Sequence, residues 1–462
     1  MDLEGLSTHS VRGLARGEGI VRILTAALKA VEPGEAVSKH LQRQSSVLQV
    51  DDRAFDLNRF RRVRLVGAGK AGFPMALAAV EILGSYFSEG LVIVKEGYLD
   101  KGQSPISLEF REAGHPIPDK RGIEATQGIQ SMLADSQPDD LLLVLISGGG
   151  SALMTAPAPG ISLADLQKLT GSLLASGANI QQINMLRKHL DIVKGGGLAR
   201  MASPATVITL ILSDVVGDPL DVIASGPTVP DPTTFSEALH VLERYQLLES
   251  TPAAILDRLR RGARGEEEET PKPDDPLFKE VNNVIIGSNA LAAQAAQAAA
   301  QSEGFNSILL TTFLQGEARQ AGRFLASLVR QITVSGQPLP RPACLIAGGE
   351  TTVTLRSNKA QNSLSSLGGR NQELALAAVS EISGLADVAL IALATDGGDG
   401  PTDAAGAVVT GDTLTRAQRS GLNPGDFLSR NDSYHFFAAL DDLLKPGPTQ
   451  TNVNDLTFLF AL

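Results

Sequence analysis

Short apolar runs that end in glycine or small polar residues recur along this 462-residue chain, and this pattern limits the folds it can adopt. Near-continuous apolar runs are typical of strands covered on both faces, and polar turns at their carboxyl ends line the ligand edge of a parallel sheet. The sequence therefore predicts an α/β protein with several functional loops at one sheet edge. The runs lie at residues 64–66, 141–146, 208–212, 284–286, 345–347 and 388–394.

Helical patterns separate these runs. Capping-box patterns predict two helices that begin after Ser162 and Asn179. We expect the second helix to continue to the glycines at 195–197. Residues 289–302 are rich in alanine, which predicts another helix.

Length and composition predict two domains. A chain of 462 residues exceeds the usual size of one domain, and 43% hydrophobic residues are enough for a sizeable core. Residues 261–279 hold a run of glutamates and several prolines, which is typical of a solvated, stiff connection. We therefore expect domains at 1–275 and 276–462.

Charge and cysteine content exclude several protein classes. With 40 Lys and Arg against 51 Asp and Glu, the net charge of −11 disfavours nucleic acid and anionic membranes as partners. Cys344 is the single cysteine, so no internal disulfide forms, and the six histidines show no zinc-ligand spacing. No apolar run approaches the roughly 18 residues of a membrane-spanning helix, and residues 1–20 lack the apolar segment of a signal peptide. We expect a cytoplasmic protein.

The loop at residues 67–72 matches the G-x-G-x-x-G pattern of dinucleotide-binding folds. That pattern requires an acidic residue at the end of the next strand. The assignment of this residue is ambiguous here, because Lys95 precedes Glu96. Lys70, at a helix start beside glycine N–H groups, suits the oxygens of a transferring phosphoryl group. The alternative is a tight turn with a solvent-exposed lysine.

A second loop places Gly148, Gly149 and Gly150 between Ser147 and Ser151. Consecutive glycines let backbone N–H groups converge on an anion, and the flanking hydroxyls add donors. The alternative is a flexible buried turn.

Aspartates also follow the apolar runs. Asp214 and Asp218 come after the run at 208–212, and Asp396, Asp399 and Asp403 come after the last run. Such carboxylates bind Mg²⁺ or orient a hydroxyl, whereas the second group lacks the EF-hand spacing of a Ca²⁺ site. The alternative for each is a turn residue that bonds its own backbone.

Arg370 follows a polar stretch at 356–366 and two glycines, and it lies at the predicted start of a helix. An arginine there is placed like a clamp for phosphate or carboxylate, and a surface arginine is the alternative. His115 lies in a loop bracketed by prolines and is only a weak candidate for the site.

Together these loops resemble the class II glycerate kinases, the glycerate 2-kinase family whose C-terminal half is called the MOFRL domain. The resemblance covers nearly the whole chain. It is carried by residues 66–71, 114–116, 145–153, 184–198, 212–218, 224–228, 348–352, 368–373, 396–403 and 451–455. One small departure is Gln450, where relatives often carry a smaller residue.

The resemblance implies a larger Rossmann-like α/β/α domain followed by a smaller α/β domain, with the active site in the cleft between them. It also implies ATP- and Mg²⁺-dependent phosphorylation of D-glycerate at the 2-hydroxyl, with functional cations at Lys70 and Arg370. We expect Asp214 to join these two as a catalytic residue, and a homodimer is left open.

We expect the nucleotide contacts and metal ligands to come from the loops described above. The expected nucleotide contacts are Gly67, Gly69, Ser147, Gly148, Gly149, Gly150, Ser151, Lys194, Gly349 and Glu350. The expected metal ligands are Asp214, Asp396 and Asp399.

Two other functions remain open at this point. Some relatives of the family have been labelled hydroxypyruvate reductases, and the glycine fingerprint at 67–72 supports an NAD(P)H-dependent reductase. A non-enzymatic sensor of sugar acids is the other alternative. The nucleotide that raises the melting temperature would discriminate among the three.

Overall fold

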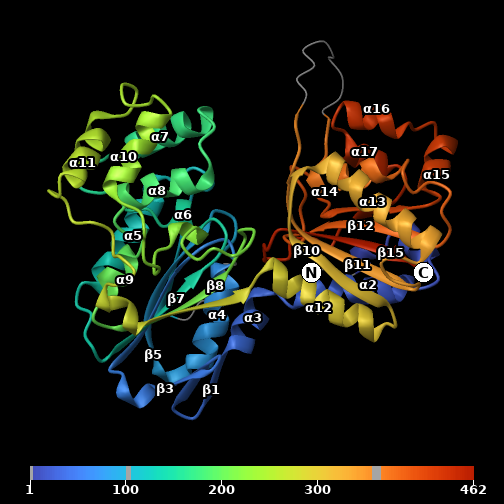
Figure 1. The fold of residues 1–462 in the computed structure, drawn as a ribbon. Coiled ribbons are helices and arrows are strands. Elements are labelled where there is room, and N and C mark those ends of the chain that lie inside the picture. Colours follow the sequence, from blue (N-terminus) through green and yellow to red (C-terminus); the bar gives the residue numbers. More distant parts are fainter. Residues whose placement is uncertain (1–3, 100–105, 356–365) are drawn as a thin grey trace. The chain divides into compact units, whose positions relative to one another are not determined.

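The computed structural model describes residues 4–99, 106–355 and 366–462, and the chain forms two compact units (Figure 1). The central unit is Pro33–Ile286. The terminal unit combines Met1–Glu32 with Gly287–Leu462. In the part of the chain that the structure describes, no helix has the length and apolar character needed to cross a membrane.

The central unit is built on a six-stranded sheet with the order β6-β5-β4-β7-β8-β9, which is the strand order of the Rossmann fold. The β4 strand pairs in parallel with β5 and β7, and the β5–β6 and β7–β8 pairs are also parallel. The strand order reverses between β4 and β7, so the loops that follow these two strands leave the sheet in opposite directions. Such sheets bind ligands at this position, which is called the topological switch point. The strands are β4 (Arg62–Ala68), β5 (Phe87–Lys95), β6 (Leu108–Ala113), β7 (Asp140–Ile146), β8 (Thr206–Leu212) and β9 (Val281–Gly287).

Helices surround this sheet, and α7, α8, α10 and α11 gather at one end of the unit (Figure 1). They share a separate hydrophobic core that includes Leu169, Leu186, Phe235 and Leu259. The helices of the unit are α3 (Pro33–His40), α4 (Gly72–Leu83), α5 (Lys120–Leu133), α6 (Gly150–Leu153), α7 (Leu163–Ala175), α8 (Ile180–Leu190), α9 (Gly197–Ala202), α10 (Phe235–Arg244) and α11 (Ala253–Ala263).

Both predicted capping boxes form, at Ser162 and Asn179, but α8 ends earlier than the sequence predicts. The helix stops at Leu190 because Asp191 adopts an extended backbone. Its carboxylate accepts the N–H groups of Ala156 and Val193, which fixes the chain in this new direction.

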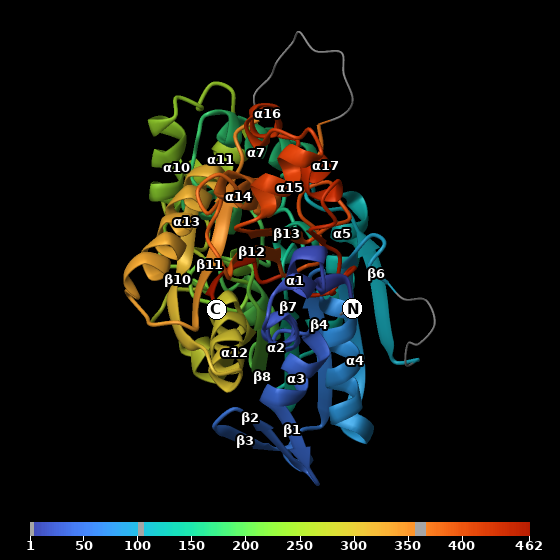
Figure 2. The same ribbon diagram turned by 90° about the vertical axis from the view of Figure 1, so that its right-hand side faces the viewer.

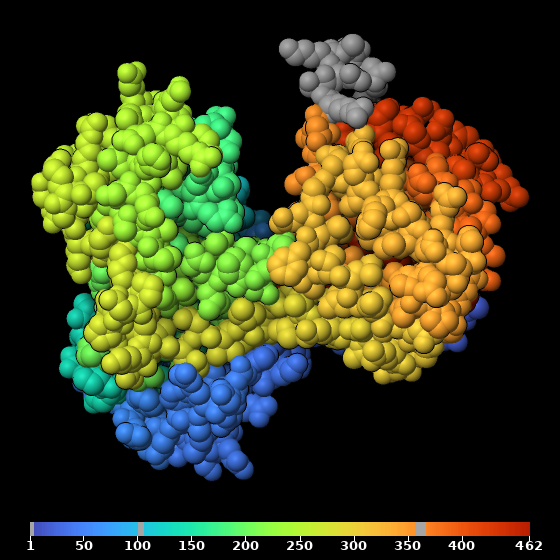
Figure 3. Space-filling model, in the orientation of Figure 1, coloured from blue at the N-terminus to red at the C-terminus, as the bar shows by residue number. Residues whose placement is uncertain are grey.

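A small antiparallel sheet of β1 (Leu41–Gln44), β2 (Val47–Val50) and β3 (Arg53–Asp56) completes the central unit. It lies within the blue lobe of this unit in the space-filling view (Figure 3).

The terminal unit has a mixed sheet with the order β10-β11-β15-β12-β13-β14. Among its described strands, only the β10–β11 pair is parallel, and the C-terminal β15 lies antiparallel between β11 and β12. The apolar runs correctly predicted β11 and β12, but they do not reveal strand direction. The strands are β10 (Asn306–Glu317), β11 (Ala343–Thr352), β12 (Val388–Ala394), β13 (Gly406–Thr410), β14 (Leu443–Leu444) and β15 (Asp455–Ala461).

The N-terminal helix α2 packs beside α12 in the terminal unit (Figure 2). The predicted helix at 289–302 is confirmed as α12. The helices of the unit are α1 (His9–Gly13), α2 (Gly17–Lys29), α12 (Asn289–Ser302), α13 (Ala318–Ser335), α14 (Arg370–Ala378), α15 (Thr413–Arg419), α16 (Pro424–Ser429) and α17 (Ser433–Ala438).

The observed division differs from the expected boundary between residues 275 and 276 in two respects. The N-terminal segment joins the terminal unit, where Arg22 pairs with Glu303 and the Thr451 hydroxyl donates to the Val31 carbonyl. The acidic stretch at 261–279 stays in the central unit, because Glu269 accepts the Phe235 N–H and lies 3.2 Å from His189 Nε2. These long-range contacts carry no local sequence signal.

Candidate functional site

Two glycine loops are joined at the switch point of the central sheet. The Lys70 N–H donates to the Gly148 carbonyl at 2.9 Å, and the Ser147 hydroxyl accepts the Ala71 N–H at 3.0 Å. Gly69 has a φ of 148°, and a Cβ there would lie 2.0 Å from Ser147 Oγ. The close approach of the two loops therefore requires glycine at this position. The loop that carries Lys70 and the predicted anion nest form one structure.

The glycine loop after β7 also contacts two titratable side chains. A Cβ at Gly148 would lie 2.3 Å from Asp214 Oδ2, and a Cβ at Gly149 would lie 2.9 Å from His115 Cδ2. Gly149 has a φ of 86°, which further favours glycine. The structure thus brings Asp214, His115 and the Lys70 loop around a single turn of backbone.

This neighbourhood favours an anionic ligand. Within residues 4–99, 106–355 and 366–462, no carboxylate pairs with the Lys70 ammonium, and no protein acceptor meets the N–H groups of Gly148 and Gly149. Burial, with added repulsion from Lys70 and Lys95, lowers the pKa of His115 to about 4. The imidazole is therefore neutral at pH 7.

A hydrogen-bonded chain continues from the glycine loop toward α8. The Ser225 hydroxyl donates to Asn184 Oδ1 at 3.0 Å and lies 2.9 Å from the Ser151 hydroxyl. Ala224 and Ser225 have φ values of 50° and 62°, in the left-handed region that costs non-glycine residues about 1–2 kcal/mol each. Such strain is found preferentially at functional sites.

Lys194, an expected nucleotide contact, is buried and engaged elsewhere. Its ammonium lies 2.7 Å from an Asp191 carboxylate oxygen and donates to the Met154 carbonyl at 3.1 Å. Burial lowers its pKa, although Asp191 opposes this shift. These bonds tie the end of α8 to the segment after α6, and they favour a structural role over the expected nucleotide contact.

Two of the expected glycine contacts have packing roles. A Cβ at Gly67 would lie 2.7 Å from the Leu145 carbonyl oxygen on the neighbouring strand. Gly349 has a φ of 148°, and a Cβ there would lie 2.2 Å from the Leu314 carbonyl oxygen on β10. Close approach of neighbouring strands therefore explains these two glycines without a ligand.

The terminal unit holds a different cationic site at Arg370, the first residue of α14. The guanidinium forms a two-pronged contact with Asp455, with one N–H···O distance of 3.1 Å, and donates to Glu350 at 2.7 Å. Glu350 lies on β11, and Asp455 begins β15 opposite Gly349. Burial opposes the charged form, but Asp455 and Glu350 raise the pKa of Arg370 overall. Residues 356–365, in the polar stretch before Arg370, lie outside the described residues.

Asp399, an expected metal ligand, supports α14 instead. One of its oxygens accepts the Asn371 N–H at 3.1 Å and the other accepts the Gln372 N–H at 2.8 Å, so the carboxylate caps the helix that carries Arg370. Burial, followed by repulsion from Asp455, raises the pKa of Asp399 to about 7. Engagement of both oxygens disfavours the expected role in metal binding.

The three expected metal ligands are divided between the two units. Asp214 belongs to the central unit, whereas Asp396 and Asp399 belong to the terminal unit. Asp396 also accepts the Gly398 N–H at 3.1 Å, as a turn residue would. Over the described ranges, no group of three His, Cys, Asp or Glu side chains is arranged to hold a metal.

Sequence reasoning missed Asp455 and gave little weight to His115. Asp455 lies at the amino end of its strand and reaches the site edge only because β15 runs antiparallel to β11. A pattern that looks for polar residues after apolar runs cannot find it. The signals for His115 were its loop position between glycine and proline and the family resemblance at residues 114–116.

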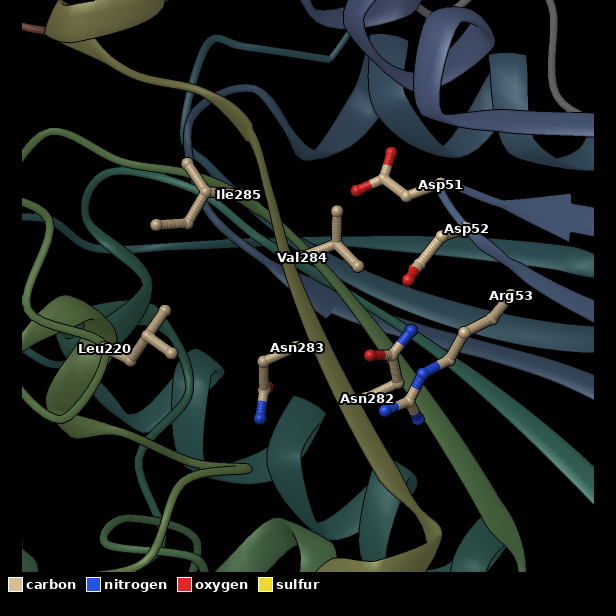
Figure 4. A pocket seen from close by; sticks show the side chains of 8 residues that line it. All are labelled: Asp51, Asp52, Arg53, Leu220, Asn282, Asn283, Val284 and Ile285. Carbon is tan, nitrogen blue, oxygen red and sulfur yellow. The ribbon is translucent and has the colours of Figure 1, made fainter.

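A pocket of about 350 Å³ lies elsewhere in the central unit (Figure 4). None of the expected site residues lines it, and Figure 4 shows Leu220 on one side and Arg53 with Asn282 on the other. We therefore place the candidate site at the glycine loops. The pocket is lined by Asp51, Asp52, Arg53, Leu220, Asn282, Asn283, Val284 and Ile285.

The fold and these loops define an α/β protein with a Rossmann-type unit whose glycine loops favour an anionic ligand. Residues 20–260 match the family described as a domain of unknown function, DUF4147, and residues 343–455 match the MOFRL family. The chain is 42% identical to the D-glycerate 2-kinase of Thermotoga maritima, over 94% of this chain and 96% of that protein. It is also 42% identical to the glycerate 2-kinase of Pyrococcus horikoshii, over 94% and 95% of the two chains.

A solved structure of glycerate kinase from Thermotoga maritima matches with a TM-score of 0.85 and 40% identity, and covers 96% of this chain and 99% of that one. The chain therefore belongs to the glycerate 2-kinase family, with a MOFRL domain in its C-terminal part.

Proposed function

We propose that this chain transfers the γ-phosphoryl group of ATP to the 2-hydroxyl of D-glycerate and releases 2-phospho-D-glycerate and ADP. The observation that carries the proposal is the joined pair of glycine loops, where the Lys70 N–H donates to Gly148. Among the described residues, neither the Lys70 ammonium nor the N–H groups of Gly148 and Gly149 have a protein partner. The names of the relatives from Thermotoga maritima and Pyrococcus horikoshii, D-glycerate 2-kinase and glycerate 2-kinase, support the same reaction.

Lys70 stabilises charge on the transferring phosphoryl group in this proposal. The transition state of phosphoryl transfer spreads negative charge over the equatorial oxygens, so positioned cations and N–H donors supply most of the catalysis. The bond from the Lys70 N–H to Gly148 fixes the two loops against each other. The donors are therefore held in place before the substrate arrives.

Mg²⁺ enters with ATP as part of the substrate, and Asp214 is the carboxylate that we assign to it. Magnesium at nucleotide sites is commonly held by one or two carboxylates together with phosphate oxygens, so a three-carboxylate cluster is not needed. The Asp214 carboxylate lies against Gly148, next to the proposed phosphate position. His115 is neutral there and can donate a hydrogen bond without adding charge.

Arg370 is the second cation of the proposed mechanism. Its contact with Asp455 orients the guanidinium, and release of Glu350, which is more exposed than Asp455, would open one donor to the phosphoryl group. If Lys70 and Arg370 act on the same phosphoryl group, each unit supplies one cation to its transfer.

A hydroxypyruvate reductase remains the second candidate, because relatives from Agrobacterium vitis carry that name provisionally. Lys95 ends β5, where a dinucleotide fold needs an acidic residue for the adenosine ribose. This observation favours the kinase. A sensor without chemistry gives no reason why, among the described residues, Lys70 and the N–H groups of Gly148 and Gly149 have no protein partner.

One assay separates these functions. The purified chain is incubated with D-glycerate, ATP and MgCl₂, and ADP release is followed. A parallel sample receives hydroxypyruvate and NADH or NADPH, and its absorbance at 340 nm is followed. The kinase proposal expects ADP release that depends on glycerate and no oxidation of either reduced nucleotide. The reverse result would establish the reductase, and inactivity in both samples would favour the sensor.

We further propose a cytoplasmic enzyme whose partners are small molecules, because the net charge of −11 gives no support for nucleic acid. A homodimer is a separate proposal, and size-exclusion chromatography with light scattering would test it.

A further inference from the structure

Arg187 on α8 is a cation for which the described residues supply no partner. In the described part of the chain, no carboxylate lies within ion-pair distance of its guanidinium and no acceptor bonds to it. The side chain is partly buried, and burial lowers its pKa, although the charge of Asp191 opposes this. A desolvated guanidinium is costly unless an anion compensates it.

The neighbouring cations of this region are all compensated. Lys188, the next residue on α8, lies 3.2 Å from Asp221 and 3.4 Å from Asp231. Lys194 lies 2.7 Å from Asp191, whose oxygens also accept two backbone N–H groups. Both oxygens of the Asp191 carboxylate therefore already have partners. Arg187 and Lys194 carry two positive charges against the single negative charge of Asp191, so one positive charge is not neutralised.

Arg187 lies on the side of α8 that faces the candidate site. Residues 184, 187 and 191 fall close together around a helix of 3.6 residues per turn. Asn184 connects through Ser225 to Ser151 of the glycine loop. Asp191, just past the end of α8, bonds Ala156 in the segment after α6. Arg187 therefore lies between two positions that both contact the loop region following β7.

We propose that Arg187 binds the carboxylate of the hydroxy-acid substrate and so determines the preference for an acid over a neutral polyol. The inference rests on the proposed function, because it names the group that recognises glycerate in that reaction. A guanidinium offers two parallel N–H groups that match a carboxylate, and the loop beside it already holds donors for phosphate. A three-carbon acid is short, so its carboxylate must bind close to the loop where its hydroxyl reacts.

The test compares Arg187→Gln and Arg187→Lys with the wild type, and Arg200→Gln serves as a matched control at an arginine that pairs with Glu268. We expect Arg187→Gln to raise the KM for D-glycerate at least 30-fold and the KM for ATP less than 3-fold. The KM of Arg187→Lys for D-glycerate should lie between those of the wild type and Arg187→Gln, because lysine keeps the charge but not the two-pronged contact. An unchanged KM for glycerate, or a rise confined to the KM for ATP, would overturn the proposal.

A binding experiment keeps the proposal testable if the chain has no kinase activity. Isothermal titration without nucleotide should show that the wild type binds D-glycerate at least 10-fold more tightly than glycerol, and that Arg187→Gln removes this preference. Equal affinities of the variant and the wild type for D-glycerate would contradict the role of Arg187. Since Arg187→Lys retains the charge and the aliphatic stem, its affinities for D-glycerate and glycerol are measured instead if Arg187→Gln does not fold.

Discussion

The candidate functional cations of the two units are held in opposite ways. In the central unit, Lys70 and Arg187 have no carboxylate partner within the described residues. In the terminal unit, Arg370 contacts both Asp455 and Glu350. An uncompensated cation is ready to bind an anion at once, whereas a paired arginine must first lose a partner. Under the proposed function, we therefore expect the central unit to bind the anionic substrates and Arg370 of the terminal unit to act later, during catalysis.

Replacement of Lys70 tests the central unit most strongly. We expect Lys70→Ala to lower turnover by about 10²–10³, the range seen when one preorganised electrostatic group is lost. Folding should survive, because the side chain is only partly buried and makes no ion pair in the described structure. Lys120→Ala removes an exposed lysine of the same unit and should leave turnover unchanged. Wild-type turnover in Lys70→Ala would remove the basis for the comparison.

Replacement of Arg370 tests the terminal unit. We expect Arg370→Ala to lower turnover by about 10² and Arg370→Lys to recover little of it, since an ammonium cannot reproduce the planar two-pronged contact. Steady-state kinetics with both substrates provide the measurement. If Arg370→Ala raises only the KM for glycerate and leaves turnover intact, Arg370 stabilises the bound substrate and the transition state equally. The proposed division between the units would then be wrong.

A side chain at Gly148 should disturb the contact between the glycine loop and Asp214. The new Cβ of Gly148→Ala would lie 2.3 Å from the Asp214 carboxylate, so the loop or the aspartate must move. We expect turnover to fall by about 10-fold, since small displacements of positioned groups are costly. Gly171→Ala is the matched control, because open space surrounds that helix position, and it should stabilise the chain by about 0.5–1 kcal/mol. Equal turnover in the two variants would show that the loop tolerates displacement.

The smallest effect concerns His115 and pH. Its pKa falls from an ordinary value near 6.5 to about 4 on folding. Between these values the unfolded chain binds more protons at this position, so acidification from pH 6.5 toward 4 destabilises the folded state. His115→Gln should therefore lose less stability than the wild type between pH 7 and 5 in urea unfolding. The exposed His240 provides the control, and His240→Gln should behave like the wild type. An identical pH dependence in His115→Gln would show that the imidazole is not desolvated.

The local patterns of the sequence were sufficient to predict the strands and the glycine loops of the central unit. Parallel strands buried on both faces leave continuous apolar runs, and their carboxyl ends share one edge, so Lys70, Ser147 and Asp214 could be grouped in advance. The start of α14 at Arg370 was also predicted correctly, because glycines precede it.

The remaining features depend on contacts between distant parts of the chain. The antiparallel placement of β15 brings Asp455 to Arg370, and Asp399 caps a helix that begins nearly thirty residues earlier. The association of α2 with α12 moves the N-terminal residues into the terminal unit. None of these has a periodic or local signature, so the sequence suggested a metal ligand at Asp399 where the structure shows a helix cap.

The position of the phosphoryl group in the product tests the account most directly. The chain is incubated with ATP, MgCl₂ and D-glycerate, the protein is removed, and purified enolase is added, because enolase dehydrates 2-phosphoglycerate and not the 3-phosphate. We predict that enolase alone consumes the product and forms phosphoenolpyruvate. Consumption only after phosphoglycerate mutase is added would show transfer to the 3-hydroxyl and contradict the proposed reaction.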